Sequence, residues 1–341
     1  MLCYFSSEFC IATIMNKILA VTMGEPAGVG GEIILKAWQA RVEQDLPAFF
    51  TIDNIPRLKA IAPDCPIKEI STPDEAMDAF NHALPVLNID LPEKPKLGAL
   101  NPANGRAVLT SIEMGVEFCM KGEASAMVTN PIHKAALYNV GFKHPGHTEF
   151  IAHLCGKNET PVMMLMARDL RCVPLTVHIP LKDVPQAVTQ ALIIEKARIL
   201  RHALQQDFGI QNPHIAVAGL NPHAGEDNKI GFEDSTVIAP AIEALRQEGV
   251  NITGPHPADT MFHEQARAQY DAAIGMYHDQ ALIPVKTIDF HGGVNITLGL
   301  SVVRTSPDHG TALDIAGQNI ANYQSLMNAI KAAAQIVENR T

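Results

Sequence analysis

The sequence lacks paired cysteines and long apolar runs. Its six cysteines are Cys3, Cys10, Cys65, Cys119, Cys155 and Cys172. None of them belongs to a CxxC pair, which argues against a zinc ribbon or a disulfide framework. No apolar run approaches the roughly 20 residues of a membrane span, and the first residues lack the basic start and long apolar stretch of a signal peptide. We therefore expect a protein of the reducing cytoplasm.

Positive charge is also scarce. The 26 Lys and Arg residues are outnumbered by 36 Asp and Glu residues, which gives a formal net charge of −10. A protein that follows the phosphates of a nucleic acid needs a basic stripe, so this balance argues against such a partner. A small bound anion would instead need cations that are gathered locally.

Short apolar runs are abundant. Hydrophobic residues make up 47% and charged residues 18%, which is typical of globular proteins. The length of 341 residues exceeds the about 100–200 residues of a usual domain, so we expect two domains. Residues Met1–Ile14 carry no motif, and we expect them to be a dispensable N-terminal extension.

The apolar runs alternate with amphipathic segments of helix length, a pattern typical of βαβ units around a mostly parallel sheet. We expect the first strand at Ile18–Gly24 and the following helix at Glu32–Ala40. Further strands are expected at Ala126–Thr129, Cys172–Val177, His214–Leu220, Ala272–Tyr277 and Leu298–Arg304. The sequence thus predicts an α/β fold.

The segment GEPAGVGGE, residues Gly24–Glu32, lies between the first expected strand and helix. It does not fit the GxGxxG fingerprint, since Ile33 stands where the third glycine would be, and no GK[ST] of a Walker loop follows. Two interpretations remain. The favoured one is a tight structural turn, and the other is an anion or substrate loop at a helix N-terminus.

Three histidines follow directly on expected strands: His178, His223 and His278. Ligands of open α/β sheets bind at the carboxyl ends of strands, so these imidazoles could converge on one metal. The long spacings suit a catalytic metal centre with open positions rather than a finger-like site. For any one histidine taken alone, a hydrogen-bonded position at a strand end is the more common explanation.

Two further groups carry polar side chains suited to an anionic ligand. In HPGHTEF, His147, Thr148 and Glu149 offer donors and acceptors, although a helix cap at Thr148 explains part of the pattern. Farther along, Lys286, Asn295 and Arg304 supply two cations and an amide in an acidic protein. Taken singly, each is more often a solvated surface residue.

Eight strings resemble those of the 4-hydroxythreonine-4-phosphate dehydrogenase family, in the family's order: MGEPAGVGGEI, VTNPIHKAAL, HPGHTEF, LNPHAGE, PADTMF, YHDQALIPVK, GVNITLGL and RTSPDHGTALDIAG. The resemblance implies that His178, His223 and His278 bind the metal. It also implies a set of substrate-binding residues, namely His147, Thr148, Lys286, Asn295 and Arg304. We further consider Asp259 for proton transfer and Lys286 for catalysis.

The string HGTALDIAGQNIAN is similar to a loop of isocitrate and isopropylmalate dehydrogenases, which bind a dinucleotide without the glycine fingerprint. This kinship implies two α/β/α lobes with a central cleft, and cofactor contacts from His309, Gly310, Thr311 and Asp314. We expect residues 15–140 plus 298–341 in the first lobe, and residues 141–297 in the second lobe with the metal ligands and dimer contacts.

The family resemblance also implies the chemistry. The expected reaction oxidises 4-phosphooxy-L-threonine to 2-amino-3-oxo-4-phosphooxybutanoate with NAD or NADP and one divalent metal, zinc, magnesium or cobalt. Decarboxylation then gives 3-amino-2-oxopropyl phosphate for pyridoxine 5′-phosphate biosynthesis, where pyridoxine 5′-phosphate synthase would receive it. We expect a homodimer with its active site at the subunit interface, where His178 and His223 come from one chain and His278 from the other.

Three alternatives stay open. A paralogue acting on 4-phospho-threonate or 4-phospho-erythronate would keep the same metal ligands and phosphate contacts. A metal-dependent hydrolase could use three histidines, but it has no need for the DIAG-type loop. A catalytically inactive metal-binding or scaffold protein would not need a competent side chain at each matched position. The departures from the family, Glu25 for Asp and Gly31 for Pro, affect only the first loop.

Overall fold

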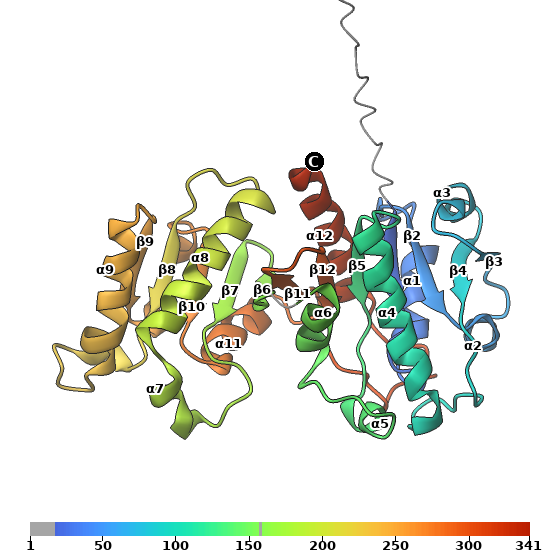
Figure 1. Cartoon of the computed structure of the whole chain (residues 1–341), viewed down its shortest axis with the longest axis horizontal. Helices are drawn as coiled ribbons and strands as arrows, with labels where there is room; N and C mark the ends of the chain where they lie inside the picture. The colour runs from blue at the N-terminus through green and yellow to red at the C-terminus, as the bar shows by residue number, and fades with distance from the viewer. Residues whose placement is uncertain (1–17, 157–158) are drawn as a thin grey trace, which may run out of the picture.

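The computed structural model describes residues 18–156 and 159–341, so the expected extension Met1–Ile14 lies outside the described residues. Its centre is one twelve-stranded sheet in the order β3-β4-β2-β1-β5-β12-β11-β6-β7-β10-β8-β9 (Figure 1). The strands are β1 (Leu19–Thr22), β2 (Phe49–Asp53), β3 (Ile67–Ile70), β4 (Leu84–Asn88), β5 (Ala126–Thr129), β6 (Val162–Ala167), β7 (Leu170–Pro174), β8 (Ile215–Ala218), β9 (Ile252–His256), β10 (Ala272–Gly275), β11 (Val294–Leu298) and β12 (Arg304–Pro307).

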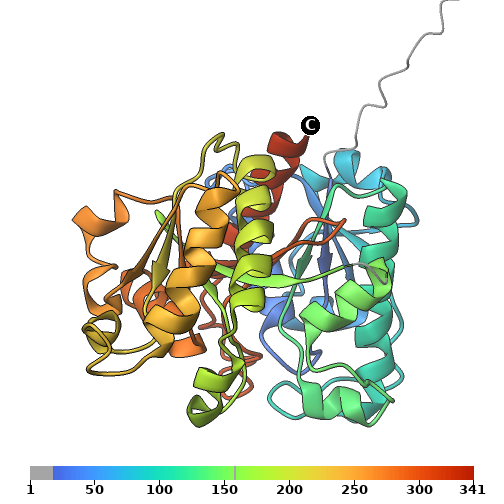
Figure 2. The ribbon, with the colours of Figure 1, turned by 60° about the vertical axis from the view of Figure 1, so that its left-hand side comes forward.

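Helices cover both faces of this sheet, as the two views in Figures 1 and 2 show. The α-helices are α1 (Gly30–Gln39), α2 (Ile55–Ile61), α3 (Glu75–Phe80), α4 (Gly105–Lys121), α5 (Lys134–Tyr138), α6 (His147–Cys155), α7 (Val184–Ala187), α8 (Gln190–Gln206), α9 (Ala239–Gln247), α10 (Glu264–Arg267), α11 (His278–Ile288) and α12 (Gln324–Arg340). The predicted α/β class is confirmed. No helix in the described part of the chain is long and apolar enough to cross a membrane.

Most strand pairs are parallel, and the apolar runs explain why. Strands β1 and β5 are buried along their whole length, as expected for strands covered by helices on both faces. The exceptions lie in the middle of the sheet, where β11 pairs antiparallel with both β12 and β6, and β6 pairs antiparallel with β7. The lobe boundaries expected near residues 141 and 298 remain a prediction.

The expected strand at Ala126–Thr129 coincides with β5, while β1, β7, β8 and β10 each end two or three residues earlier than expected. The expectation of one strand at Leu298–Arg304 is wrong, because β11 ends at Leu298 and β12 begins only at Arg304. The chain turns at Gly299, which has a φ of +75° and where a Cβ would collide with the Thr160 carbonyl. This turn brings Arg304 back along β11 with its guanidinium buried.

Candidate active site

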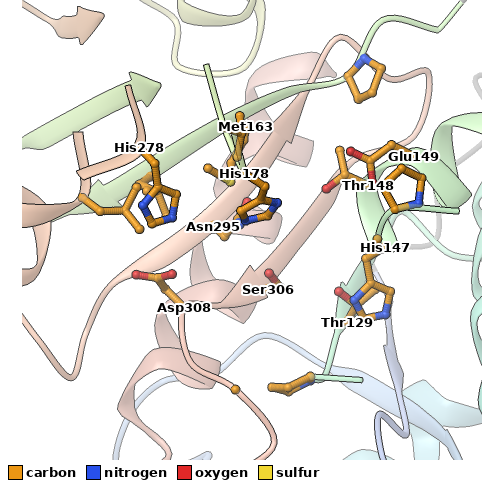
Figure 3. A pocket seen from close by; sticks show the side chains of 18 of the residues that line it. Thr129, His147, Thr148, Glu149, Met163, His178, His278, Asn295, Ser306 and Asp308 are labelled. Carbon is orange, nitrogen blue, oxygen red and sulfur yellow. The ribbon is translucent and has the colours of Figure 1, made fainter. Parts of the chain in front are cut away.

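One cavity of about 730 Å³ collects most of the residues that the sequence singled out. It is lined from β5, α6, β6, α11, β11 and β12 and from the loop after β7. The predicted residues that line it are His147, Thr148, His178, His278, Lys286, Asn295, Arg304, His309 and Gly310. Figure 3 shows His178 beside His278, with His147 and Thr129 at the other end. We call these the imidazole end and the anion end.

Arg304 forms the anion end as a buried cation that has no ion pair with a carboxylate among the described residues, although the charge of Glu149 acts on it. Its Nε and Nη2 donate to Thr129 Oγ1 at 3.1 and 2.7 Å, and its Nη1 donates to Thr297 Oγ1 at 2.9 Å. Burial lowers the pKa of Arg304 to about 10, so the guanidinium stays charged at neutral pH. Because two neutral hydroxyls cannot offset that charge, an anion that enters the cavity gains a strong charge-assisted contact.

His147 begins α6 and lies close to this guanidinium. Burial, followed by the charges of Arg304 and Lys134, lowers the pKa of His147 well below its ordinary value, so the imidazole is neutral at pH 7. Its Nε2 is buried without a hydrogen-bond partner, as is Oδ1 of Asn295. Buried polar atoms left unpaired are costly, so both atoms are suited to hydrogen bonds with a ligand.

At the imidazole end, the rings of His178 and His278 lie 5.7 Å apart between centroids. His278 stands at the start of α11, and its Nδ1 lies 2.7 Å from Asp279 Oδ1. This contact orients the ring and leaves the other nitrogen for a ligand. Burial, then the charges of Lys134 and His278, lowers the pKa of His178, which favours the neutral form that binds metals.

His223 does not line the cavity in this chain and is exposed. It follows β8 in a left-handed stretch, with φ of +52° at His223, +50° at Ala224 and positive values through Asn228. Such backbone costs energy for residues with a side chain. Asp234 holds the base of the loop by accepting hydrogen bonds from the backbone nitrogens of Leu220 and Asn221.

The expected allocation of ligands between two chains stays a prediction, since a single chain does not test it. We expected His178 with His223, yet within one chain His178 lies against His278. In the described ranges, no group of three or more His, Cys, Asp or Glu side chains could hold a metal ion. The three predicted ligands thus stay a prediction, with two of them in contact and the third elsewhere.

Lys286 projects from α11 and forms an ion pair with Asp308, with Nζ and Oδ2 2.7 Å apart. Asp308 lies just after β12 and was not singled out from the sequence, although the string RTSPDHG contains it. Thr129, the partner of Arg304, was also missed, despite standing at a strand end in VTNP. Asp259, by contrast, is exposed in a short 3-10 turn and does not line this cavity.

Only some of the residues expected to bind the dinucleotide line the cavity. His309 and Gly310 line the cavity, whereas Thr311 and Asp314 do not. The carbonyl of Thr311 accepts a hydrogen bond from the Val29 backbone nitrogen at 3.1 Å, and a Cβ at Gly28 would lie 2.8 Å from the same oxygen. The first glycine segment therefore packs against the DIAG-type loop, which supports the structural-turn interpretation.

Comparison with known proteins assigns the chain to the oxidoreductases, as an enzyme of the dehydrogenase class. The chain belongs to the family described as pyridoxal phosphate biosynthetic protein PdxA, whose model matches residues 48–333. The 4-hydroxythreonine-4-phosphate dehydrogenase of Caulobacter vibrioides is 49% identical over 330 residues, which cover 95% of this chain and 99% of that protein. The enzyme of the same name from Erythrobacter litoralis is 50% identical over 331 residues, 95% of this chain and 98% of that one.

A solved structure agrees as well. The crystal structure of 4-hydroxythreonine-4-phosphate dehydrogenase from Klebsiella pneumoniae superposes with a TM-score of 0.83 at 35% identity, over 94% of this chain and 99% of that one. A terephthalate 1,2-cis-dihydrodiol dehydrogenase from Burkholderia xenovorans is similar at a TM-score of 0.63 and 26% identity, over 94% of this chain and 98% of that one. The fold is thus shared by dehydrogenases named for two different substrates.

Proposed function

We propose that the protein oxidises the C3 hydroxyl of 4-phosphooxy-L-threonine with NAD or NADP, with loss of CO₂ from the resulting β-keto acid. The observation that carries this proposal is the buried Arg304, a cation with only hydroxyl partners, in the same cavity as two facing imidazoles. The substrate has an anionic group at each end and a hydroxyl between them, which matches this layout. Membership of the family supports the choice of substrate.

The anion end would bind and orient the substrate. Arg304 offers a guanidinium fork to one of the two anionic groups, and neutral His147 adds a hydrogen bond without a charge of its own. The free Asn295 oxygen can accept a hydrogen bond from the ammonium or hydroxyl of the substrate. Fixing both ends would hold the C3 hydrogen in one position for transfer, and the predicted dinucleotide contacts His309 and Gly310 line the same cavity.

His178 and His278 fit a divalent metal, since both line the cavity and their rings lie beside each other. A metal held there would act as a Lewis acid on the hydroxyl and later on the new carbonyl. Lys286 can stabilise the negative charge that remains when CO₂ leaves, because its ammonium borders the same cavity. Asp308 holds that ammonium in place.

We further propose that the third imidazole comes from a second copy of the chain, so that His178 and His278 of one chain meet His223 of the other. Exposed apolar side chains support a self-association surface near all three histidines: Ile179, Leu181, Ile230, Phe232, Ile283 and Phe290. Ile179 and Leu181 follow His178, and Ile230 and Phe232 lie in the segment after His223. Ile283 lies on α11 and Phe290 just beyond its end. Large exposed apolar groups of this kind mark interfaces.

Turnover of 4-phosphooxy-L-threonine with each dinucleotide, before and after chelation, tests the proposal. We expect reduced dinucleotide and CO₂ in equal amounts, and loss of both when the metal is removed. Parallel assays with 4-phospho-threonate and 4-phospho-erythronate separate the paralogue, which would prefer a substrate without the amine. Turnover that needs no dinucleotide would overturn the proposal in favour of a hydrolase.

A further inference from the structure

A second cavity, of about 480 Å³, lies on the opposite face of the sheet from the active site. Met166 and Val294 line it, while their strand neighbours Leu165 and Asn295 line the active site. Successive side chains of a strand point to opposite faces, so the two cavities are separated by β6 and β11. The C-terminal helix α12 forms the far wall through Lys331 and residues beside it.

The charge of this cavity is unusual for an acidic protein. Three cations line it, Arg168, Arg171 and Lys331, and none of its lining residues is acidic. The carboxylates of Asp169 and Asp271 partly offset the charge of Arg171 from outside the cavity, and Asp169 is also paired with Arg267. Within the cavity lining the cations still outnumber the carboxylates, which favours an anionic ligand.

Arg171 is held as a rigid part of this cavity. Its guanidinium lies 4.8 Å from the centre of the Phe208 ring, and its Nη1 donates to the Asp271 carbonyl at 3.1 Å. Its Nε is buried without a hydrogen-bond partner. Burial lowers the pKa of Arg171, a sign that the charge is poorly solvated. A fixed, poorly solvated guanidinium is the kind of group that binds a phosphate well.

We propose that this cavity is a second binding site, separate from the active site, for a small phosphate ester with an apolar body. Arg168, Arg171 and Lys331 would bind the phosphate, and the apolar body would pack on the wall formed by Met166, Phe208 and Ala332. Strands β6 and β11 carry the lining of this cavity on one face and the lining of the active site on the other.

Calorimetric titration of the intact protein with phenyl phosphate tests this, with inorganic phosphate as the comparison. Wild type should bind two molecules of phenyl phosphate per chain. Arg168→Gln/Lys331→Gln, both at exposed positions, should lose one of them or bind it about tenfold or more weakly. The matched control Arg106→Gln/Lys121→Gln removes the same charge from exposed positions on α4 and should still bind two.

Arg304→Gln keeps this experiment separate from the proposed function. This variant should lose the phenyl phosphate bound in the active site and keep the one bound in the α12 cavity. Failure of the proposed function and failure of the second site therefore give different numbers of bound molecules in the two variants. Inorganic phosphate that binds there as well as phenyl phosphate would overturn the requirement for an apolar body. Two undiminished binding events in Arg168→Gln/Lys331→Gln would overturn the site itself.

Discussion

The two ends of the active-site cavity differ in how much of each one chain supplies. The anion end is complete, since Arg304, Thr129 and Thr297 are joined by hydrogen bonds across three strands. The imidazole end has two rings in contact, and its third predicted member lies in a strained, exposed loop. The difference teaches that one chain brings together the residues of the anion end but only two of the three predicted metal ligands, which is why we propose that a second copy supplies the third.

The largest expected effect belongs to the imidazole end. His278→Ala should lower kcat by about 10³-fold or more, since a Lewis acid contributes several kcal/mol to such a step. The KM for substrate should change little, because the anion end is untouched. Steady-state kinetics together with bound-metal content measure both. His202→Ala, an exposed histidine on α8, is the matched control and should keep full activity.

A smaller effect is expected at the anion end. Arg304→Gln should raise the KM for substrate about 10- to 100-fold, because a hydrogen bond to a charged group contributes about 1.5–3 kcal/mol. Repeating the assay with 4-hydroxy-L-threonine, which lacks the phosphate, shows which anionic group Arg304 binds. If it binds the phosphate, the variant and the wild type should handle that substrate alike. A normal KM for the phosphorylated substrate would contradict the assignment of the anion end.

The smallest effect concerns pH. The pKa of His147 is lowered in the folded chain, so below its ordinary value of 6.5 the unfolded chain binds a proton that the folded chain does not. The free energy of unfolding should therefore fall as pH drops below 6.5 and be unaffected by this group above it. Urea unfolding from pH 7.5 to 5 checks this. His147→Asn should show a shallower decline, and an identical one would contradict the lowered pKa.

The sequence singles out Arg304 and His147 of the anion end, and both line the cavity. Arg304 nevertheless begins β12, where the periodicity predicted the end of a strand. His223 lies five residues beyond the end of β8, in a left-handed stretch that no periodicity predicts. Asp308 and Thr129 were missed because each acts through a partner that is distant in the sequence. These partners, Lys286 and Arg304, come near only in the folded chain.

The same limit applies to the question of which predicted ligands lie together within one chain. Spacing along the chain places His178 nearer to His223 than to His278, yet β7 is hydrogen-bonded to β10, so the loops that follow these two strands are neighbours. Strand β8 lies on the other side of β10. Strand order decides which histidines meet, and strand order cannot be obtained from hydrophobic periodicity.

Mixed dimers of differently tagged chains test the shared centre most directly. If His178 and His278 of one chain meet His223 of the other, a His178→Ala chain paired with a His223→Ala chain has one intact centre. Such purified heterodimers should recover about half of the wild-type activity and about one metal per dimer. A His178→Ala chain paired with a His278→Ala chain should stay inactive, because each centre lacks one ligand. Recovery in this second pair, with none in the first, would contradict the account.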